Sequence, residues 1–149
     1  MRAEILRGSG YSAYRVRLET LLDISVLASD MDIHNCITQG FPAARLVKLT
    51  EDGTVSQLER DQIIRPRTLK SRINRDQLLT VEESDRLFRI AHIHAMADAV
   101  FGESDKAKLW LSKPKVRFGG MAPVQMLNSQ QGTSQVEDML LQLAEGFML

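Results

Sequence analysis

The sequence has little of the chemistry that most often reveals what a protein does. Its 149 residues include one cysteine, Cys36, so no internal disulfide can form and the composition suits a reducing compartment. A small buried apolar residue is a commoner role for such a cysteine than a reactive thiol. Aromatic residues make up only 5%, so a core must be built mostly from aliphatic side chains.

Long apolar runs and a net charge are also missing. The N-terminal segment carries Glu4 and Arg7 where a signal peptide needs an apolar run. The longest apolar stretch, residues 21–28, contains Asp23 and is far shorter than the roughly 20 residues of a membrane span. We therefore expect a cytoplasmic protein with no membrane partner. Lys and Arg together number 19, as do Asp and Glu, so net charge indicates no anionic partner.

Motifs of the common enzyme classes are absent as well. The chain has no Gly-x-Gly-x-x-Gly fingerprint, no Walker loop and no Gly-x-Ser-x-Gly elbow. His92 and His94 are two residues apart, so on a helix they point about 200° away from each other and cannot share a metal ion. His34 and Cys36 have the same unsuitable spacing. We therefore expect no metal site, and nothing in these residues argues for an enzyme. We interpret the two later histidines as polar members of a packed helix or of its interfaces.

The sequence does contain a series of helical patterns. After an irregular first dozen residues, helices are expected over residues 14–28, 31–39, 42–52, 54–60, 66–73, 80–101, 105–112, a short stretch from 123, and 132–147. For residues 14–28 a strand is the alternative to the helix that we favour. Asp30 and Ser104 are expected N-caps, and Thr80 with Glu83 forms a capping box. No convincing strand pattern occurs. The sequence therefore predicts an all-α fold.

The strongest local signal is a concentration of positive charge. The segment 60–75 holds six basic residues and one acidic residue, Asp61. The basic residues are Arg60, Arg65, Arg67, Lys70, Arg72 and Arg75. Residues 54–73 read as helix, tight turn and helix, and in a helix-turn-helix the second helix enters the major groove while flanking cations neutralise phosphates. We therefore predict DNA contacts from the cations of residues 65–75 and from Thr68 and Ser71.

A solvated basic face on an ordinary helical hairpin is the alternative interpretation. Charge runs alone favour it, because most of them lie on solvated surfaces. Glu59 and Ile63 also depart from the usual motif, which has a small residue in its first helix and often glycine in the turn.

The segment from Leu109 to Leu127, LWLSKPKVRFGGMAPVQML, allows two interpretations. Cations beside a Gly-Gly pair are compatible with a phosphate cradle, but no strand precedes the pair as a phosphate loop requires. The alternative is a connector between helices, with Trp110 as an apolar anchor and Gly119 and Gly120 at a sharp turn. We favour the connector.

The C-terminus is the other unusual feature. Phe147, Met148 and Leu149 are three consecutive apolar residues at a chain end, where fraying would leave about 1.5–3 kcal/mol of burial per large side chain unused. They either fold back on their own core or enter a partner. An apolar end that carries a carboxylate suits a cationic cleft on another protein.

Several of these pieces occur together in one known family. They are RLFRIA from Arg86, AVFG from Ala99, AKLWL from Ala107, Gly119–Gly120 followed by Pro123, Leu127, Gly132, VEDMLL from Val136, and Gly146. In this order they resemble the C-terminal toxin-binding domain of Xre/ParS-type antitoxins, over residues 80–149. The resemblance extends less firmly to Gly40-Phe41-Pro42 and to the helix after Pro66, and residues 1–30 match nothing we can name. It implies an N-terminal helix-turn-helix region, residues 1–76, and a toxin-binding domain, residues 77–149.

The resemblance implies an antitoxin of a type II toxin–antitoxin system, which is not itself an enzyme and needs no cofactor. Such proteins bind a co-encoded RES-domain toxin that consumes NAD+, and many repress their own operon by binding operator DNA as dimers or larger complexes with toxin. The implied toxin contacts are Trp110, Arg117, Gly119, Gly120, Leu143, Gly146, Phe147, Met148 and Leu149. A stand-alone helix-turn-helix regulator whose C-terminal half only dimerises is the alternative.

Overall fold

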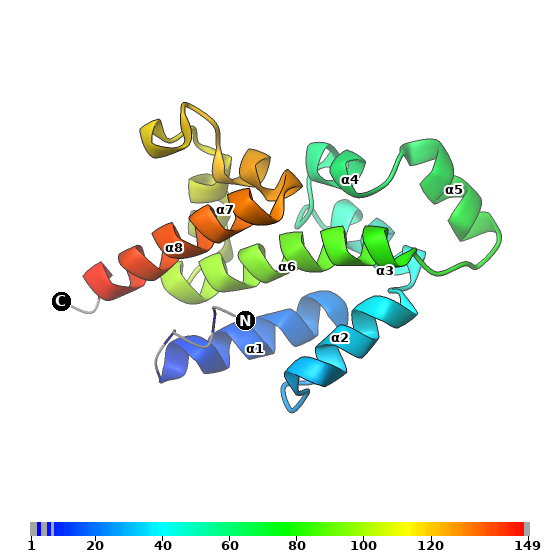
Figure 1. Ribbon diagram of the computed structural model, residues 1–149, viewed down its shortest axis with the longest axis horizontal. Coiled ribbons are helices and arrows are strands. Elements are labelled where there is room, and N and C mark those ends of the chain that lie inside the picture. Colours follow the sequence, from blue (N-terminus) through cyan, green and yellow to red (C-terminus); the bar gives the residue numbers. More distant parts are fainter. Residues whose placement is uncertain (1–2, 4–5, 7, 148–149) are drawn as a thin grey trace. The chain divides into compact units, whose positions relative to one another are not determined.

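The computed structural model describes residues 3, 6 and 8–147, and within these residues the chain forms helices and no strand (Figure 1). The only regular pairing between extended residues in this part of the chain is one isolated bridge, between Pro42 and Leu78. The predicted all-α fold is therefore confirmed.

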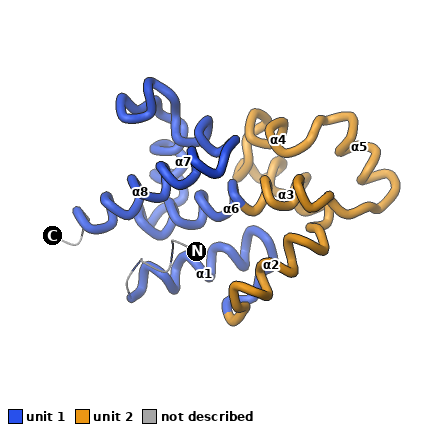
Figure 2. Tube along the Cα trace, in the orientation of Figure 1, with its two compact units in different colours: residues 1–26, 89–149 blue, residues 27–88 orange. Residues whose placement is uncertain are grey.

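The chain divides into two compact units (Figure 2). Unit 2, residues 27–88, holds α2 (Asp30–Gln39), α3 (Ala43–Glu51), α4 (Gln57–Ile63) and α5 (Pro66–Asn74). Unit 1, residues 1–26 and 89–149, holds α1 (Ser9–Leu22), α7 (Ser104–Ser112), η2 (Val116–Phe118), η3 (Pro123–Asn128) and α8 (Gln130–Phe147). Helix α6 (Val81–Phe101) begins in unit 2 and continues into unit 1. The boundary predicted between residues 76 and 77 lies inside unit 2.

Unit 2 is held together where the segment before α6 returns to the start of α3. The Leu79 amide donates to the Phe41 carbonyl oxygen at 2.8 Å, and the Phe41 amide donates to the Ser84 hydroxyl at 3.0 Å. Gly40 has φ +97°, and a Cβ there would lie 2.4 Å from the Leu79 carbonyl oxygen. This close approach explains why glycine ends α2 at this point.

Unit 1 is built around the second part of α6. Residues 90–97 are all buried, as expected for a helix that is apolar over most of its circumference. The fully buried Leu18 of α1, Met96 of α6 and Leu140 of α8 belong to the aliphatic core. This aliphatic packing agrees with the low content of aromatic residues in the sequence.

The N-terminal expectations need correction. Helix α1 begins at Ser9, inside the segment expected to be irregular, and ends at Leu22 rather than near residue 28, because Asp23 is left-handed with φ 59°. The cap of α2 is Ser29 and not Asp30. The Ser29 hydroxyl accepts from the Asp32 amide at 3.1 Å, while the Asp32 carboxylate accepts from the Ser29 amide at 2.9 Å. Such reciprocal bonding satisfies two otherwise unpaired amides.

Later helix ends are partly as predicted. The Thr80–Glu83 capping box is confirmed, with the Thr80 amide donating to the Glu83 carboxylate at 2.8 Å and the Glu83 amide to the Thr80 hydroxyl at 3.2 Å. Helix α4 occupies Gln57–Ile63 and not residues 54–60, because Ser56 forms a capping box with Glu59. Ser104 is the first residue of α7, and Glu103 before it makes no side-chain cap.

Candidate functional site

Helices α4 and α5, which correspond to the predicted hairpin, are joined by a two-residue extended connection, and both contact α3. Pro66 begins α5, where its missing N–H costs nothing. Glu59 and Ile63, which depart from the usual motif, are both buried. The Glu59 carboxylate accepts from the Ser56 amide at 3.2 Å, and Ile63 is 1% exposed in the core. Both departures therefore have a structural role in positioning α4.

The predicted DNA-contacting residues of this hairpin do not all share one environment. Those with exposed side chains are Arg65, Arg67, Lys70, Ser71 and Arg75. Thr68 is half-buried, and Leu69 turns the opposite face of α5 into the core. The hairpin thus offers a row of cations to solvent.

Arg72 differs from its neighbours because it is paired inside unit 2. Its Nη1 contacts the Glu83 carboxylate and lies 3.4 Å from the Leu78 carbonyl oxygen. The side chains of Arg72 and Glu83 are 18% and 12% exposed, so this pair is largely shielded from water. Arg72 therefore fastens the segment between α5 and α6, which favours a structural role over a phosphate contact.

The connector after α7 is a closed loop. The Lys115 amide donates to the Met121 carbonyl oxygen at 3.0 Å, and the Gly120 amide donates back to the Lys115 carbonyl oxygen at 2.9 Å. Gly119 and Gly120 have φ values of +64° and +88°, in the left-handed region that favours glycine. The pair therefore makes the sharp turn expected of a connector.

Trp110 anchors this connector. Its ring lies 5.8 Å from that of Phe101, and Lys115 Nζ lies 4.9 Å from the Trp110 ring centroid, within range of a cation–π interaction. Partial burial lowers the pKa of the Lys115 ammonium, and the neighbouring Lys113 lowers it further. Arg117 Nη1 donates to Gln142 Oε1 at 2.6 Å and so ties the connector to α8.

Burial fades along α8 toward its C-terminal end. Val136, Leu140 and Leu141 are buried, Leu143 and Ala144 are half-buried, and Gly146 is exposed. The apolar side chains that recur along α8 at helical spacing therefore belong to the core only in the first part of the helix. The side chain of Phe147, together with Met148 and Leu149, lies outside the described residues.

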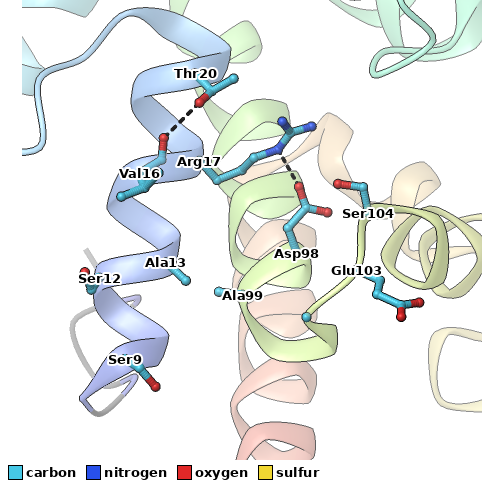
Figure 3. A pocket seen from close by; sticks show the side chains of 11 residues that line it. Ser9, Ser12, Ala13, Val16, Arg17, Thr20, Asp98, Ala99, Glu103 and Ser104 are labelled. Atoms are coloured by element: carbon cyan, nitrogen blue, oxygen red, sulfur yellow. Dashed lines mark hydrogen bonds and ion pairs between the residues drawn. The ribbon is translucent and has the colours of Figure 1, made fainter.

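A groove of about 520 Å³ lies between α1 and the junction of α6 with α7 (Figure 3). Its lining includes Val16, Ala99 and Ser104, and an ion pair joins Arg17 Nε to Asp98 Oδ2 at 2.6 Å. The lining contains both apolar and polar groups, and its cation, Arg17, is already paired with Asp98.

Three buried polar side chains join α1, α6 and α8. The Tyr14 hydroxyl lies 2.6 Å from His92 Nδ1, and His92 Nε2 lies 2.9 Å from Glu137 Oε2. Their relative exposures are 0%, 5% and 5%. The arrangement of these three side chains resembles an acid–base relay, but none of them lines the groove between α1 and α6. Because all three side chains are buried, they form a structural connection rather than a site that reacts with substrate.

This connection could not be found from the sequence. Tyr14 and His92 are 78 positions apart, and His92 and Glu137 are 45 apart. The only signal was a histidine on an apolar helix. His92 bonds across helix interfaces, as interpreted.

Two other kinds of site are absent from the described residues. No group of three or more His, Cys, Asp or Glu side chains in this part of the chain is arranged to hold a metal ion. In the same residues, none of the helices is both long enough and apolar enough to cross a membrane.

The C-terminal helices match a known family. Residues 96–146 fit the model of the antitoxin Xre/MbcA/ParS C-terminal toxin-binding domain. This match defines the class of protein: it carries the domain by which an antitoxin binds its toxin. Two relatives are named Antitoxin Xre. That of Pseudomonas putida is 68% identical over 149 residues, covering 100% of this chain and 94% of the relative. That of Yersinia enterocolitica is 32% identical over 81 residues, 54% of this chain and 55% of the relative.

The chain therefore belongs to the Xre family of antitoxins. The family resemblance predicted from the sequence is confirmed, and the partner is a toxin. Membership also indicates a regulatory binding protein.

Proposed function

We propose that this antitoxin neutralises a RES-domain toxin that consumes NAD+, by placing the end of α8 and the last three residues over the entrance to its active site. The observation that supports this most directly is the decrease of burial along α8. A helix that leaves its own core while keeping apolar residues has surface available for a partner. The resemblance to antitoxins of RES toxins supplies the toxin class.

We assign toxin contacts to two surfaces of unit 1. The first is the end of α8 with the residues that follow, from Leu143 through Gly146 to Phe147, Met148 and Leu149. The second is the connector, with Trp110, Arg117, Gly119 and Gly120. The Arg117–Gln142 bond joins the two surfaces, so both can meet one partner.

Charge supports an acidic partner surface at the connector. From Lys106 to Arg117 the chain has five cations and no acidic residue, and no Lys or Arg follows Arg117. Val116 in this segment is 98% exposed. An exposed apolar side chain between cations suits a protein interface better than a phosphate backbone, because proteins offer apolar area to cover it.

We further propose that the α4–α5 hairpin binds operator DNA and represses the operon. The exposed cations of α5 would neutralise phosphates, and a dimer or larger complex with toxin would present two hairpins to a symmetric site. Unit 2 then serves DNA and unit 1 serves toxin. The proposed location is the cytoplasm, at the nucleoid when operator is bound.

Removal of the last three residues, Phe147 to Leu149, tests the toxin proposal. We expect the shortened protein to lose neutralisation of the RES toxin in a growth-rescue assay while operator binding stays within about twofold, because α5 belongs to the other unit. Rescue by the shortened protein at matched expression would refute the role of these residues.

The second candidate, a regulator whose C-terminal half only dimerises, predicts the opposite pattern. The same truncation would change oligomeric state or operator affinity, and the full-length protein would not bind toxin. The matched antitoxin domain argues against this candidate.

A further inference from the structure

Helix α1 has no role in the functions described so far. The match to the toxin-binding domain begins at residue 96, far from α1 in sequence. In space, however, residues 1–26 belong to the same compact unit as residues 89–149. The question is what α1 contributes there.

One connection between α1 and α8 among the described residues passes through His92 of α6. An ionised Glu137 can only accept, which makes His92 Nε2 the donor in the 2.9 Å hydrogen bond between them. With a single proton on the His92 ring, Nδ1 is the acceptor and the Tyr14 hydroxyl donates to it at 2.6 Å. Each group fixes the orientation of the next, in the way that a second partner fixes the tautomer of a histidine ligand.

Glu137 is a costly choice for a buried position. It is 5% exposed, and a buried carboxylate is tolerated only where it is hydrogen-bonded or paired. Aliphatic packing alone would not need it. Its bond to His92 gives α8 a directional attachment that apolar contacts lack, because hydrogen bonds weaken steeply with angle.

The attachment lies where α8 begins to leave the core. After Leu141 no described residue of α8 is buried. From Glu137 to Phe147 the helix rises about 15 Å, so a tilt of about 5° at Glu137 would move its end by about 1.3 Å. Interfaces require placement within about 0.5 Å, so such a tilt would matter to a partner bound at the end of α8.

We propose that α1 completes the toxin-binding unit, and that Tyr14 is a positioning residue that sets the direction of α8 through His92 and Glu137. The inference rests on the proposed function, because it takes the end of α8 as toxin-contacting surface. The Arg17–Asp98 ion pair, also between α1 and α6, supports the same arrangement.

The test compares matched substitutions in the full-length protein. Tyr14→Phe removes the hydroxyl that reaches His92, whereas Tyr11→Phe removes one that, among the described residues, accepts from Arg15 of the same helix at 3.2 Å. Glu137→Leu removes the acceptor, whereas Glu137→Gln keeps an acceptor oxygen without the charge. Each variant is measured for toxin affinity, operator affinity and amide exchange in α8, at a temperature where it is fully folded.

We expect Tyr14→Phe and Glu137→Leu each to raise the toxin Kd about tenfold, and the double variant to raise it little further, because coupled residues are not additive. Tyr11→Phe and Glu137→Gln should stay within about threefold, and operator affinity should not change. Amides after residue 138 should exchange faster in Tyr14→Phe than in Tyr11→Phe.

Equal toxin affinity and equal exchange in Tyr14→Phe and Tyr11→Phe would overturn the positioning role, even if the melting temperature fell. Failure of the unmodified protein to bind the RES toxin would instead overturn the proposed function. In that case the exchange comparison still decides whether α1 controls α8.

Discussion

Two glycines of α8 show how differently one residue type can be used. A Cβ at Gly132 would lie 2.0 Å from the Met126 carbonyl oxygen, so α8 and η3 approach as closely as only glycine permits. A Cβ at Gly146 would meet no described atom within 4 Å outside its own turn of helix. The first glycine is required by packing and the second by nothing in the described structure.

We predict opposite effects of alanine at these two positions. Gly132→Ala should lower the free energy of unfolding by about 1–3 kcal/mol, because backbone must move to relieve the overlap. Gly146→Ala should leave stability unchanged or raise it by up to about 1 kcal/mol, since alanine favours the helix. Urea unfolding of both variants checks this. A Gly132→Ala protein as stable as the unmodified one would show that η3 can move away from the added methyl group without a cost in stability.

Alanine substitutions of two arginine residues of α5 should have different effects, one on DNA binding and one on stability. Arg67→Ala should weaken operator binding and reduce the salt slope by about one, because an exposed cation would meet one phosphate. Arg72→Ala should mainly reduce stability, because it removes the cation that pairs with the largely buried Glu83 carboxylate. Operator titrations at several salt concentrations and thermal unfolding distinguish the two. A reduced salt slope for Arg72→Ala with unchanged stability would show instead that Arg72 contacts a DNA phosphate.

At the scale of elements, helix caps determine where several helices begin. The hydroxyls of Ser29, Ser56 and Thr80 each accept from the amide three residues later, and the amide of each cap residue donates to the carboxylate of that later residue. Only the Thr80 box was predicted. The other two were missed because neighbouring polar residues, such as Asp30 beside Ser29, have similar cap preferences, and the choice depends on which backbone enters the helix.

The α2 cap gives a prediction about pH. The Ser29 amide, and then its hydroxyl, lower the pKa of Asp32 below its usual 3.8. A lowered pKa means that the cap contributes stability above pH 3.8 and loses it as the pH falls through the pKa of the folded state. NMR titration should give Asp32 a pKa below 3.8. Ser29→Ala should raise that pKa, and an unchanged pKa would show that the hydroxyl has no effect.

At the scale of the molecule, equal numbers of acidic and basic residues conceal segregated charge. The segment from Lys106 to Arg117 is basic, and everything after it lacks Lys and Arg. Opposite charge on a partner accelerates association and fixes orientation more than it raises affinity. The connector is therefore suited to guiding an acidic surface.

We predict that Lys113→Glu slows toxin association about 3- to 10-fold at low salt, with a smaller effect at high salt because charge is screened. Lys48→Glu makes the same change of charge on the exposed face of α3, in the other unit, and should slow association less. Stopped-flow mixing at two salt concentrations measures both. Equal slowing by the two variants would show that only net charge matters.

Most of the fold followed from local patterns, whereas most of the site did not. The positions of α5, α6 and α7 were predicted within about one residue, because proline, glycine and cap residues act over a few positions. The exposed cations of α5 were recognisable for the same reason. The pairing of Arg72 with Glu83 was not, because it depends on how residues 75–80 fold back.

The sequence by itself determined the helical class, the basic hairpin, the connector at Gly119–Gly120 and the antitoxin resemblance. Each depends on residue type and spacing over short distances, which a chain carries before it folds. Only the tertiary structure decided that α1 belongs with the C-terminal half, and that Tyr14, His92 and Glu137 form one connection. Such contacts join residues tens of positions apart, and their geometry exists only once the helices have packed.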